Sequence, residues 1–333
     1  MNLLPDHETA GGIKGRDMSS KRVISPYRNI VVNSFADDFY SNLLDWSREI
    51  IYYCIENRIY SYNFFTEEIS ELFACPSVVT AIKHNRRNEV LLVGCTTGMI
   101  FYIDTVNGEI VKKSDFSNRQ VIHKSRIGVI KNYGDCIITG SRDRKAKMID
   151  LRSRNVVNSY ASHSQEICGI SVGNKMVATG GNDNKVFVYD YRSSTPVVQL
   201  NEHKAAVKAL SWSPYSNMLV TGGGSADKTM KLYDVGRKEC LVKSINFDSQ
   251  LTNIKWLTKG TANNLVLSTF GYSDDDTKLL RDFKVQKQYS GHKNRVIHFS
   301  VSEDERYFST GSGDGTIKIW EIGGDLTEEI RMR

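Results

Sequence analysis

TIKIWEIG at residues 316–323 has the composition of a β-strand that finishes in an aromatic or apolar residue and an acid, a pattern that the chain repeats. The other copies are KAKMIDLR at 145–152, KVFVYDYR at 185–192 and MKLYDVGR at 230–237. The acids that end these strands are Asp150, Asp190, Asp234 and Glu321, so the intervals are 40, 44 and 87 residues. The last interval is about two periods. Strands that recur every ~40–45 residues are typical of WD-type β-propellers, so the repeat predicts that fold.

The rest of the chain divides into units of similar length. Residues 23–323 predict an all-β, seven-bladed WD-repeat propeller. Its units lie at about 37–72, 75–116, 125–162, 163–202, 203–247, 248–291 and from 292 onward, and the sixth is the poorest match. Residues 1–22 are polar and aperiodic, which favours a disordered arm. Residues 324–333 form a short C-terminal tail.

The spacing of several polar residues recurs between the units and indicates a structural role for them. The seventh unit has the spacing of the buried hydrogen-bonded tetrad of WD repeats, with His292, Thr310, Asp314 and Trp320. Two other units show the same histidine and aspartate positions, namely His163 with Asp183 and His203 with Asp227. A buried polar group without a partner costs ~1–3 kcal/mol, so such residues occur together. We therefore assign them no catalysis.

The two ends of the chain are expected to close the ring. Too few residues follow the strand at 316–321 to form another strand, a turn and a free tail. RNIVV at 28–32 is β-rich and is predicted to supply the missing strand of the seventh blade. Closure of this kind removes exposed strand edges, which promote aggregation.

Composition narrows the function classes. The formal charge of +6 is mild and gives no argument for nucleic-acid binding. The chain has no 18-residue apolar run and no signal-peptide pattern, so we expect a soluble protein of the nucleus and cytoplasm that does not bind membranes. The six cysteines form no CxxC pair, which favours free thiols over a metal site. No nucleophile, metal or phosphate-loop pattern is present, so neither an enzyme nor a cofactor is expected.

One segment goes beyond a generic repeat. SPYRNIVVNSFADDFYSNLLDWS at 25–47 resembles the start of the propeller in the Fizzy and Fizzy-related (Cdc20/Cdh1-type) family. That family consists of substrate-recruiting coactivators of the anaphase-promoting complex. The resemblance continues in ATGGNDNKVFVYD at 178–190 and LVTGGGSADKTMKLYD at 219–234, and is weak in blades two and six.

The resemblance implies a receptor for the KEN-box degron on one face of the propeller. The matching residues are Asn182, Asn184, Ser225, Gln250 and Arg295. Carboxamides and a hydroxyl can bind the lysine and asparagine of the motif, and a guanidinium can bind its glutamate. An alternative for the two asparagines is that they only supply turn geometry.

The resemblance also implies a destruction-box receptor between blades one and seven, where two acids take the degron's arginine. Asp38 matches the first acid, and the alternative is a surface-strand acid without a partner. Gly315 stands where the family has a glutamate, so the second acid is missing. The loss of such a charge-assisted bond is expected to weaken the arginine contact by ~1.5–3 kcal/mol.

Two further elements dock the family's members on the ligase. A C-box motif is not recognisable in the arm, whereas Met332-Arg333 resembles the family's terminal Ile-Arg. The tail either docks or is an uninvolved charged end. The implied partners are subunits of the anaphase-promoting complex, cyclin- and securin-like substrates, and checkpoint proteins, with the chain a monomer outside the complex. The alternative is a scaffold or inhibitor that has lost ligase activation.

Overall fold

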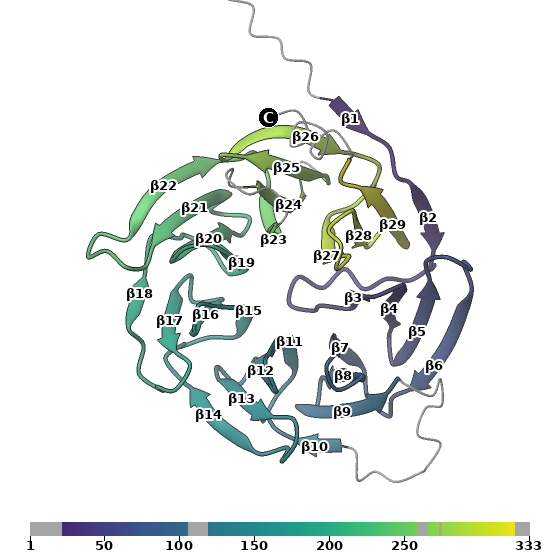
Figure 1. Ribbon diagram of the computed structural model, residues 1–333, viewed down its shortest axis with the longest axis horizontal. Coiled ribbons are helices and arrows are strands. Elements are labelled where there is room, and N and C mark those ends of the chain that lie inside the picture. The colour runs from purple at the N-terminus through teal and green to yellow at the C-terminus, as the bar shows by residue number, and fades with distance from the viewer. Residues whose placement is uncertain (1–21, 106–118, 259–264, 273–274, 324–333) are drawn as a thin grey trace, which may run out of the picture.

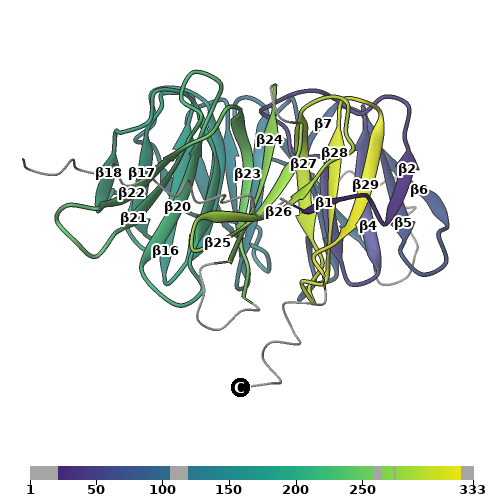
Figure 2. The same cartoon turned by 90° about the horizontal axis from the view of Figure 1, so that it is seen from above.

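The computed structural model describes residues 22–105, 119–258, 265–272 and 275–323. In this part of the chain, seven sheets stand side by side around a central channel, as Figure 1 shows. The strands run between the two faces of the ring, as the side view in Figure 2 shows. The predicted seven-bladed propeller is therefore confirmed.

Each of the first three blades is a four-stranded antiparallel sheet. Blade one contains β3 (Leu44–Ser47), β4 (Ile50–Ile55), β5 (Arg58–Asn63) and β6 (Ile69–Ala74). Blade two contains β7 (Val79–Asn85), β8 (Val90–Cys95), β9 (Met99–Asp104) and β10 (Arg119–Val121). Blade three contains β11 (Ile127–Tyr133), β12 (Cys136–Ser141), β13 (Ala146–Asp150) and β14 (Val156–Tyr160). Because β10 begins at Arg119, the second unit extends beyond the predicted limit of 116.

The remaining blades complete the ring. Blade four contains β15 (Ile167–Gly173), β16 (Met176–Gly181), β17 (Val186–Asp190) and β18 (Val198–Leu200). Blade five contains β19 (Val207–Trp212), β20 (Met218–Gly223), β21 (Thr229–Asp234) and β22 (Leu241–Asn246). Blade six contains β23 (Gln250–Trp256), β24 (Leu265–Gly271), β25 (Thr277–Arg281) and β26 (Lys284–Tyr289). Blade seven contains β27 (Val296–Val301), β28 (Tyr307–Ser312) and β29 (Thr316–Glu321), with β2 (Arg28–Val31) from the start of the chain.

Residues near the N-terminal end of the described chain join two blades. β2 pairs with β29 in the register Arg28↔Ile319 to Val31↔Thr316, so the predicted closure of blade seven is confirmed. β1 (Arg22–Ile24), which the sequence did not predict, pairs in parallel with β26 and makes blade six five-stranded. Both additions cover an edge strand whose amide and carbonyl groups would otherwise be unpaired.

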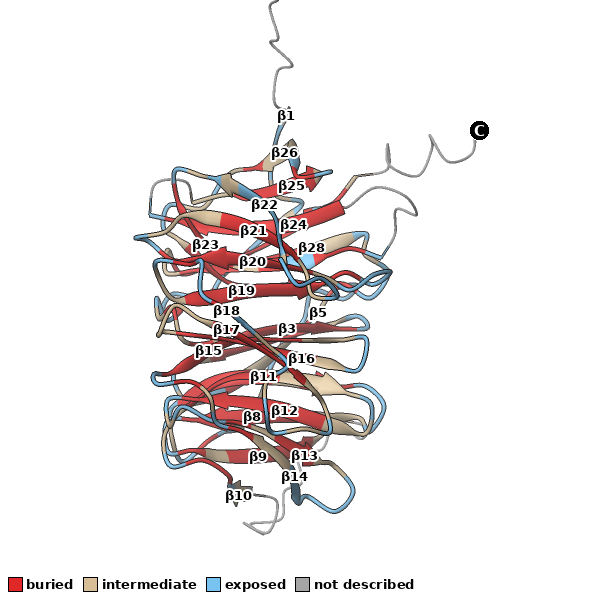
Figure 3. Ribbon diagram, turned by 90° about the vertical axis from the view of Figure 1, so that its left-hand side faces the viewer, coloured by how far each residue is buried: buried red, intermediate tan, exposed pale blue. Residues whose placement is uncertain are grey.

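The core lies between neighbouring blades. Second strands such as β8 and β24 are almost entirely buried, whereas the outer strand β22 is largely exposed, as the colouring in Figure 3 shows. This gradient follows from the ring, because each inner strand has a sheet on both faces and each outer strand borders solvent.

The predicted tetrad of blade seven is present. The Asp314 carboxylate accepts from His292 Nδ1 at 2.9 Å, and the hydroxyl of Thr310 bonds to His292 Nε2 at 2.8 Å. Trp320 Nε1 donates to the same hydroxyl at 2.7 Å. His163 and His203 make the equivalent bonds with Asp183 and Asp227. These contacts confirm the structural role predicted for the tetrad of blade seven and for the histidine–aspartate pairs of blades four and five.

Blade three carries a version of this network that the sequence reading missed. His123 bonds to Asp143 and to Thr139, each at 2.9 Å. Position 149, which corresponds to Trp320, is an isoleucine. The aromatic residue that makes the motif visible in the sequence is therefore absent from this blade.

Candidate functional site

The segment that precedes β3 crosses the upper end of the central channel, where the upper face is the one that carries residues 37–42 (Figure 1). Asn42 bridges to Ala81 of blade two and donates to the Gly128 carbonyl of blade three at 2.7 Å. Tyr40 reaches blade four, where its hydroxyl donates to the Asn182 carboxamide oxygen at 2.8 Å. This crossing segment, residues 37–42, therefore links several blades across the channel.

Two buried side chains hold the crossing segment from below. His298 Nε2 lies 2.9 Å from the Ala36 carbonyl, and its Nδ1 accepts from the Leu43 amide at 3.2 Å. Burial lowers the pKa of His298 to about 3, which keeps the ring neutral and its Nδ1 an acceptor. Lys208 Nζ donates to the Ser41 carbonyl at 2.8 Å, and burial lowers its pKa to about 7.

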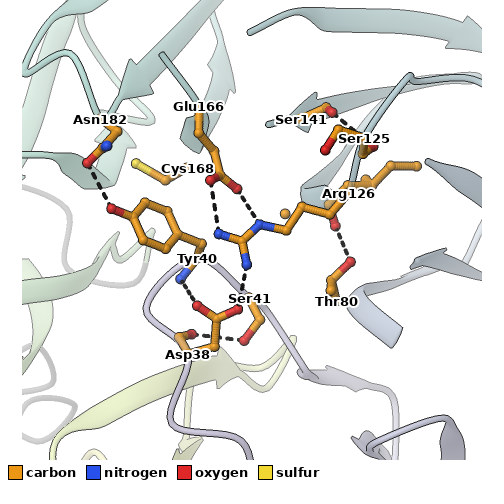
Figure 4. A network of polar contacts seen from close by, with 12 residues as sticks. Asp38, Tyr40, Ser41, Thr80, Ser125, Arg126, Ser141, Glu166, Cys168 and Asn182 are labelled. Carbon is orange, nitrogen blue, oxygen red and sulfur yellow. Dashed lines mark hydrogen bonds and ion pairs between the residues drawn. The ribbon is translucent and has the colours of Figure 1, made fainter. Parts of the chain in front are cut away.

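An ion-pair network fixes Asp38 on this segment, as Figure 4 shows. Arg126 Nη1 binds the Asp38 carboxylate at 3.0 Å, while its Nε and Nη2 bind the two oxygens of Glu166 at 2.6 and 2.9 Å. The guanidinium also lies over the Tyr40 ring, 5.0 Å from its centroid. Such a two-pronged arrangement fixes orientation as well as charge.

Arg295 makes a second contact of this type with the neighbouring acid. Its Nε binds the Asp37 carboxylate at 2.6 Å and its Nη2 donates to the Asp37 carbonyl at 2.8 Å. Its Nη1 donates to the Tyr272 hydroxyl at 2.7 Å. The guanidinium predicted to receive a ligand carboxylate thus already contacts an acid of its own chain.

A hollow of about 510 Å³ opens on the upper face beside the crossing segment. Its lining includes all five residues predicted for the KEN box, together with the acids of the crossing segment: Asn182, Asn184, Ser225, Gln250, Arg295, Asp37 and Asp38. The residues come from three blades and from the loop before β27. The structure therefore brings together side chains that lie up to 258 residues apart in the chain.

The polar groups of the hollow differ in how far the protein itself uses them. Asn182 is engaged at both ends, by Tyr40 and by Gln165, to which its nitrogen donates at 2.7 Å. Gln250 is 3% exposed, and its Nε2 has no hydrogen-bond partner among the described residues. A buried donor of this kind is costly to leave unpaired, which points to a ligand that supplies the acceptor.

Asn184 has a positive φ of 64°. Asparagine tolerates this conformation, so turn geometry is one role of the residue. Its side chain lines the hollow as well. A role in turn geometry is therefore compatible with a place in the implied receptor, which stays a prediction.

Asp38 lies beside the hollow. Its carboxylate lines it and is paired with Arg126 of blade three. The alternative of an unpaired surface acid is therefore wrong, whereas a role of Asp38 in a groove between blades one and seven stays a prediction.

Gly315 stands at the position where the resemblance implies the second acid of the destruction-box receptor. It has a φ of +76°, and a Cβ there would come within 3.2 Å of the Asn33 carbonyl oxygen. Glycine is favoured at such a position, so a glutamate would add strain as well as charge. Met332 and Arg333 lie outside the described residues.

The sequence matches a family model of this fold and curated relatives. The family model described as CDC20/Fizzy WD40 domain matches residues 32–320. The chain belongs to this family. Its Fizzy relatives include "Protein FIZZY-RELATED 1" of Arabidopsis thaliana, 30% identical over 97% of this chain and 68% of the relative. "APC/C activator protein CDH1" of Saccharomyces cerevisiae is 30% identical over 89% of this chain and 52% of the relative.

A solved relative has the same architecture. A chain of the crystal structure of the Mitotic Checkpoint Complex superposes with a TM-score of 0.83 at 26% identity, covering 97% of this Fizzy-family chain and 99% of that one. This chain spans 68%, 62% and 67% of three curated plant relatives. The recognised resemblance is thus confirmed at the level of the family.

Other classes of site find no support in the described residues. No group of three or more His, Cys, Asp or Glu side chains there is arranged to hold a metal ion. The six cysteines are free thiols, and four of them are buried. Across the same residues, the structure contains no helix with the length and apolarity needed to span a membrane.

Sequence reasoning missed three residues that line the hollow, Asp37, Tyr40 and Tyr272, and one that pairs with Asp38 beside it, Arg126. For Arg126 a signal was present, because HKSRI at 123–127 matches HKNRV at 292–296 position by position. For Asp37 and Tyr40, no pattern in the sequence indicates that the crossing segment turns toward the channel.

Proposed function

We propose that this Fizzy-family chain is a substrate-recognition coactivator of the anaphase-promoting complex that binds KEN-box degrons in the upper hollow. The unpaired Nε2 of Gln250 carries the proposal, because it is a buried donor of a residue that lines the same hollow as the other implied receptor residues. The proposal places the chain in the nucleus and cytoplasm, and its partners are ligase subunits, degron-bearing cell-cycle proteins and checkpoint proteins.

The charges of the hollow fit the three side chains of the motif. Asp38 offers a carboxylate to a lysine, and its side chain is 36% exposed. Arg295 offers a guanidinium to a glutamate. Asn184, Ser225 and Gln250 offer carboxamides and a hydroxyl to an asparagine. The hollow is lined by both acids and bases, which favours a ligand that carries both charges.

Destruction-box binding is a weaker part of the proposal. Asp38 faces the hollow, and Gly315 contributes no carboxylate. We expect the chain to capture substrates mainly through the KEN motif, with other motifs adding through effective concentration.

Fluorescence anisotropy of a labelled KEN peptide tests the proposal. Arg295→Ala should weaken binding at least tenfold, since it removes the charge that binds the glutamate. Lys293→Ala is the matched control, because Lys293 is an exposed cation two residues away that does not line the hollow. Equal affinities of wild type and Arg295→Ala would contradict the assignment of Arg295, and no binding by wild type would favour a propeller scaffold without degron recognition.

A further inference from the structure

In one layer of the central channel, three of seven equivalent positions do not make the hydrogen bond that the other four make. The layer consists of equivalent positions on the seven inner strands: Asp45, Lys83, Lys131, Ser171, Ser211, Lys255 and Ser300. These residues occupy the same register, each directly following the position that faces the core of its blade. Four of them carry a side-chain acceptor and three are lysines.

The four acceptors tie each blade to the next. Ser171 accepts from the Trp212 amide at 3.1 Å, and Ser211 accepts from the Trp256 amide at 2.9 Å. Ser300 accepts from the Trp46 amide at 2.9 Å, and Asp45 accepts from the His84 amide at 2.8 Å. A small acceptor at this position is therefore a structural element of the ring.

Lysine cannot make this bond, because an ammonium group has three donors and no acceptor. Lys83 instead pairs with Asp45, its Nζ lying 2.5 Å from the carboxylate. The ammonium groups of Lys131 and Lys255 have no ion pair or hydrogen bond among the described residues. The three lysines thus do not accept the hydrogen bond from the backbone amide of the next blade that the other four residues accept.

The space that these lysines line is open to the channel and positively charged. A cavity of about 170 Å³ in the channel is lined by four lysines, Lys83, Lys131, Lys208 and Lys255, and a single described carboxylate, Asp45. Lys208 lies higher and donates to the carbonyls of Ser41 and Ile297. The carboxylate of Glu305, the other acid near Lys255, accepts from the Thr258 amide. Two of the four lysines, Lys131 and Lys255, therefore have no carboxylate or carbonyl paired with them among the described residues.

The lysines are also accessible and influence one another. Lys131 is partly exposed and Lys255 is exposed, so solvent reaches both through the channel. Burial, together with repulsion from Lys83 and Lys255, lowers the pKa of Lys131 to about 8. The volume has room for several water molecules or for an anion of similar size.

We propose that this layer of the channel is a binding site for a small oxyanion with at least two negative charges, such as phosphate, held by Lys83, Lys131 and Lys255. The anion accepts from the ammonium groups of Lys131 and Lys255, which have no acceptor among the described residues, and from Lys83 beside its ion pair with Asp45. The site is separate from the upper hollow, because the crossing segment lies between them, and the inference does not depend on degron binding.

Titration with inorganic phosphate, followed by calorimetry and by melting temperature at pH 7, tests the site. Sodium chloride at the same ionic strength controls for screening. Wild type should bind phosphate and melt at a higher temperature in its presence, as a ligand that binds only the folded state requires. Lys255→Met should bind at least tenfold more weakly, and Lys131→Met should do the same.

A matched variant and a second readout keep the result decisive. Lys238→Met removes an exposed lysine that does not line the cavity and should bind phosphate like wild type. Without phosphate, Lys255→Met should melt no lower than wild type, because it removes an uncompensated charge. The proposal is overturned if phosphate acts on wild type no differently from chloride, or if both methionine variants retain full binding.

Discussion

Arg126 and Arg295 occupy the same position of the repeat, three residues after a tetrad histidine, and each binds one of two successive aspartates. Arg126 pairs with Asp38 at 3.0 Å, and Arg295 pairs with Asp37 at 2.6 Å. The crossing segment is thus held between blade three and blade seven by equivalent guanidinium groups. Among the residues that the structure describes, Arg126 has a further carboxylate, that of Glu166, whereas Arg295 pairs with Asp37 alone. Arg295 is therefore the one whose acid a ligand can replace.

The contact between Asp37 and Arg295 predicts competition inside the hollow. Asp37→Asn removes the charge that a degron glutamate has to displace, so we expect the KEN peptide to bind several-fold more tightly. Anisotropy with the labelled peptide measures the change. A peptide with glutamine in place of the glutamate should show no gain. Weaker binding by Asp37→Asn would instead mean that the acid orients Arg295 for the ligand.

The two asparagines of the hollow are predicted to separate stability from binding. Asn184→Gly removes the carboxamide and keeps the positive φ accessible, so affinity for the peptide should fall while the melting temperature is maintained. Asn182→Ala removes the acceptor of Tyr40 and should lower the free energy of unfolding by ~1 kcal/mol. Thermal denaturation together with peptide binding tests both. An Asn184→Gly variant that binds like wild type would limit this residue to turn geometry.

How much the sequence revealed depended on whether a residue acts within one blade or between blades. Trp320 and His292 lie in one repeat at fixed spacing, so their network was predicted, whereas His123 was missed because isoleucine stands at position 149. The five KEN candidates were found by resemblance. The course of the crossing segment was not, because the contacts of Tyr40 and His298 form only once the ring has closed.

The tetrads offer a comparison between two buried threonines. The Thr310 hydroxyl bonds to both His292 and Trp320, whereas the Thr139 hydroxyl bonds to His123 with no tryptophan beside it. Thr310→Val should therefore lower the free energy of unfolding more than Thr139→Val, by ~1–3 kcal/mol for the additional unpaired donor. Urea denaturation of the two variants measures the difference. Equal losses would show that the tryptophan bond adds little.

The neutral state of His298 predicts a pH dependence of stability. Its pKa falls from 6.5 to about 3 on folding, so the unfolded chain binds the extra proton between these values. Stability from this residue is complete above pH 6.5 and is lost as the pH falls toward 3, by ~1.4 kcal/mol per unit. His298→Gln should flatten the decline between pH 6 and pH 4. Chemical denaturation at each pH measures the slope, and an unchanged slope would contradict the assignment.

The affinity of the purified wild-type propeller for a KEN peptide, measured beside the same peptide with alanine at all three motif positions, tests the central claim most directly. The account predicts micromolar binding of the KEN peptide and at least tenfold weaker binding of the alanine peptide, because the hollow supplies partners for each side chain. Equal binding of the two peptides, or no binding of either, would contradict degron recognition by this face.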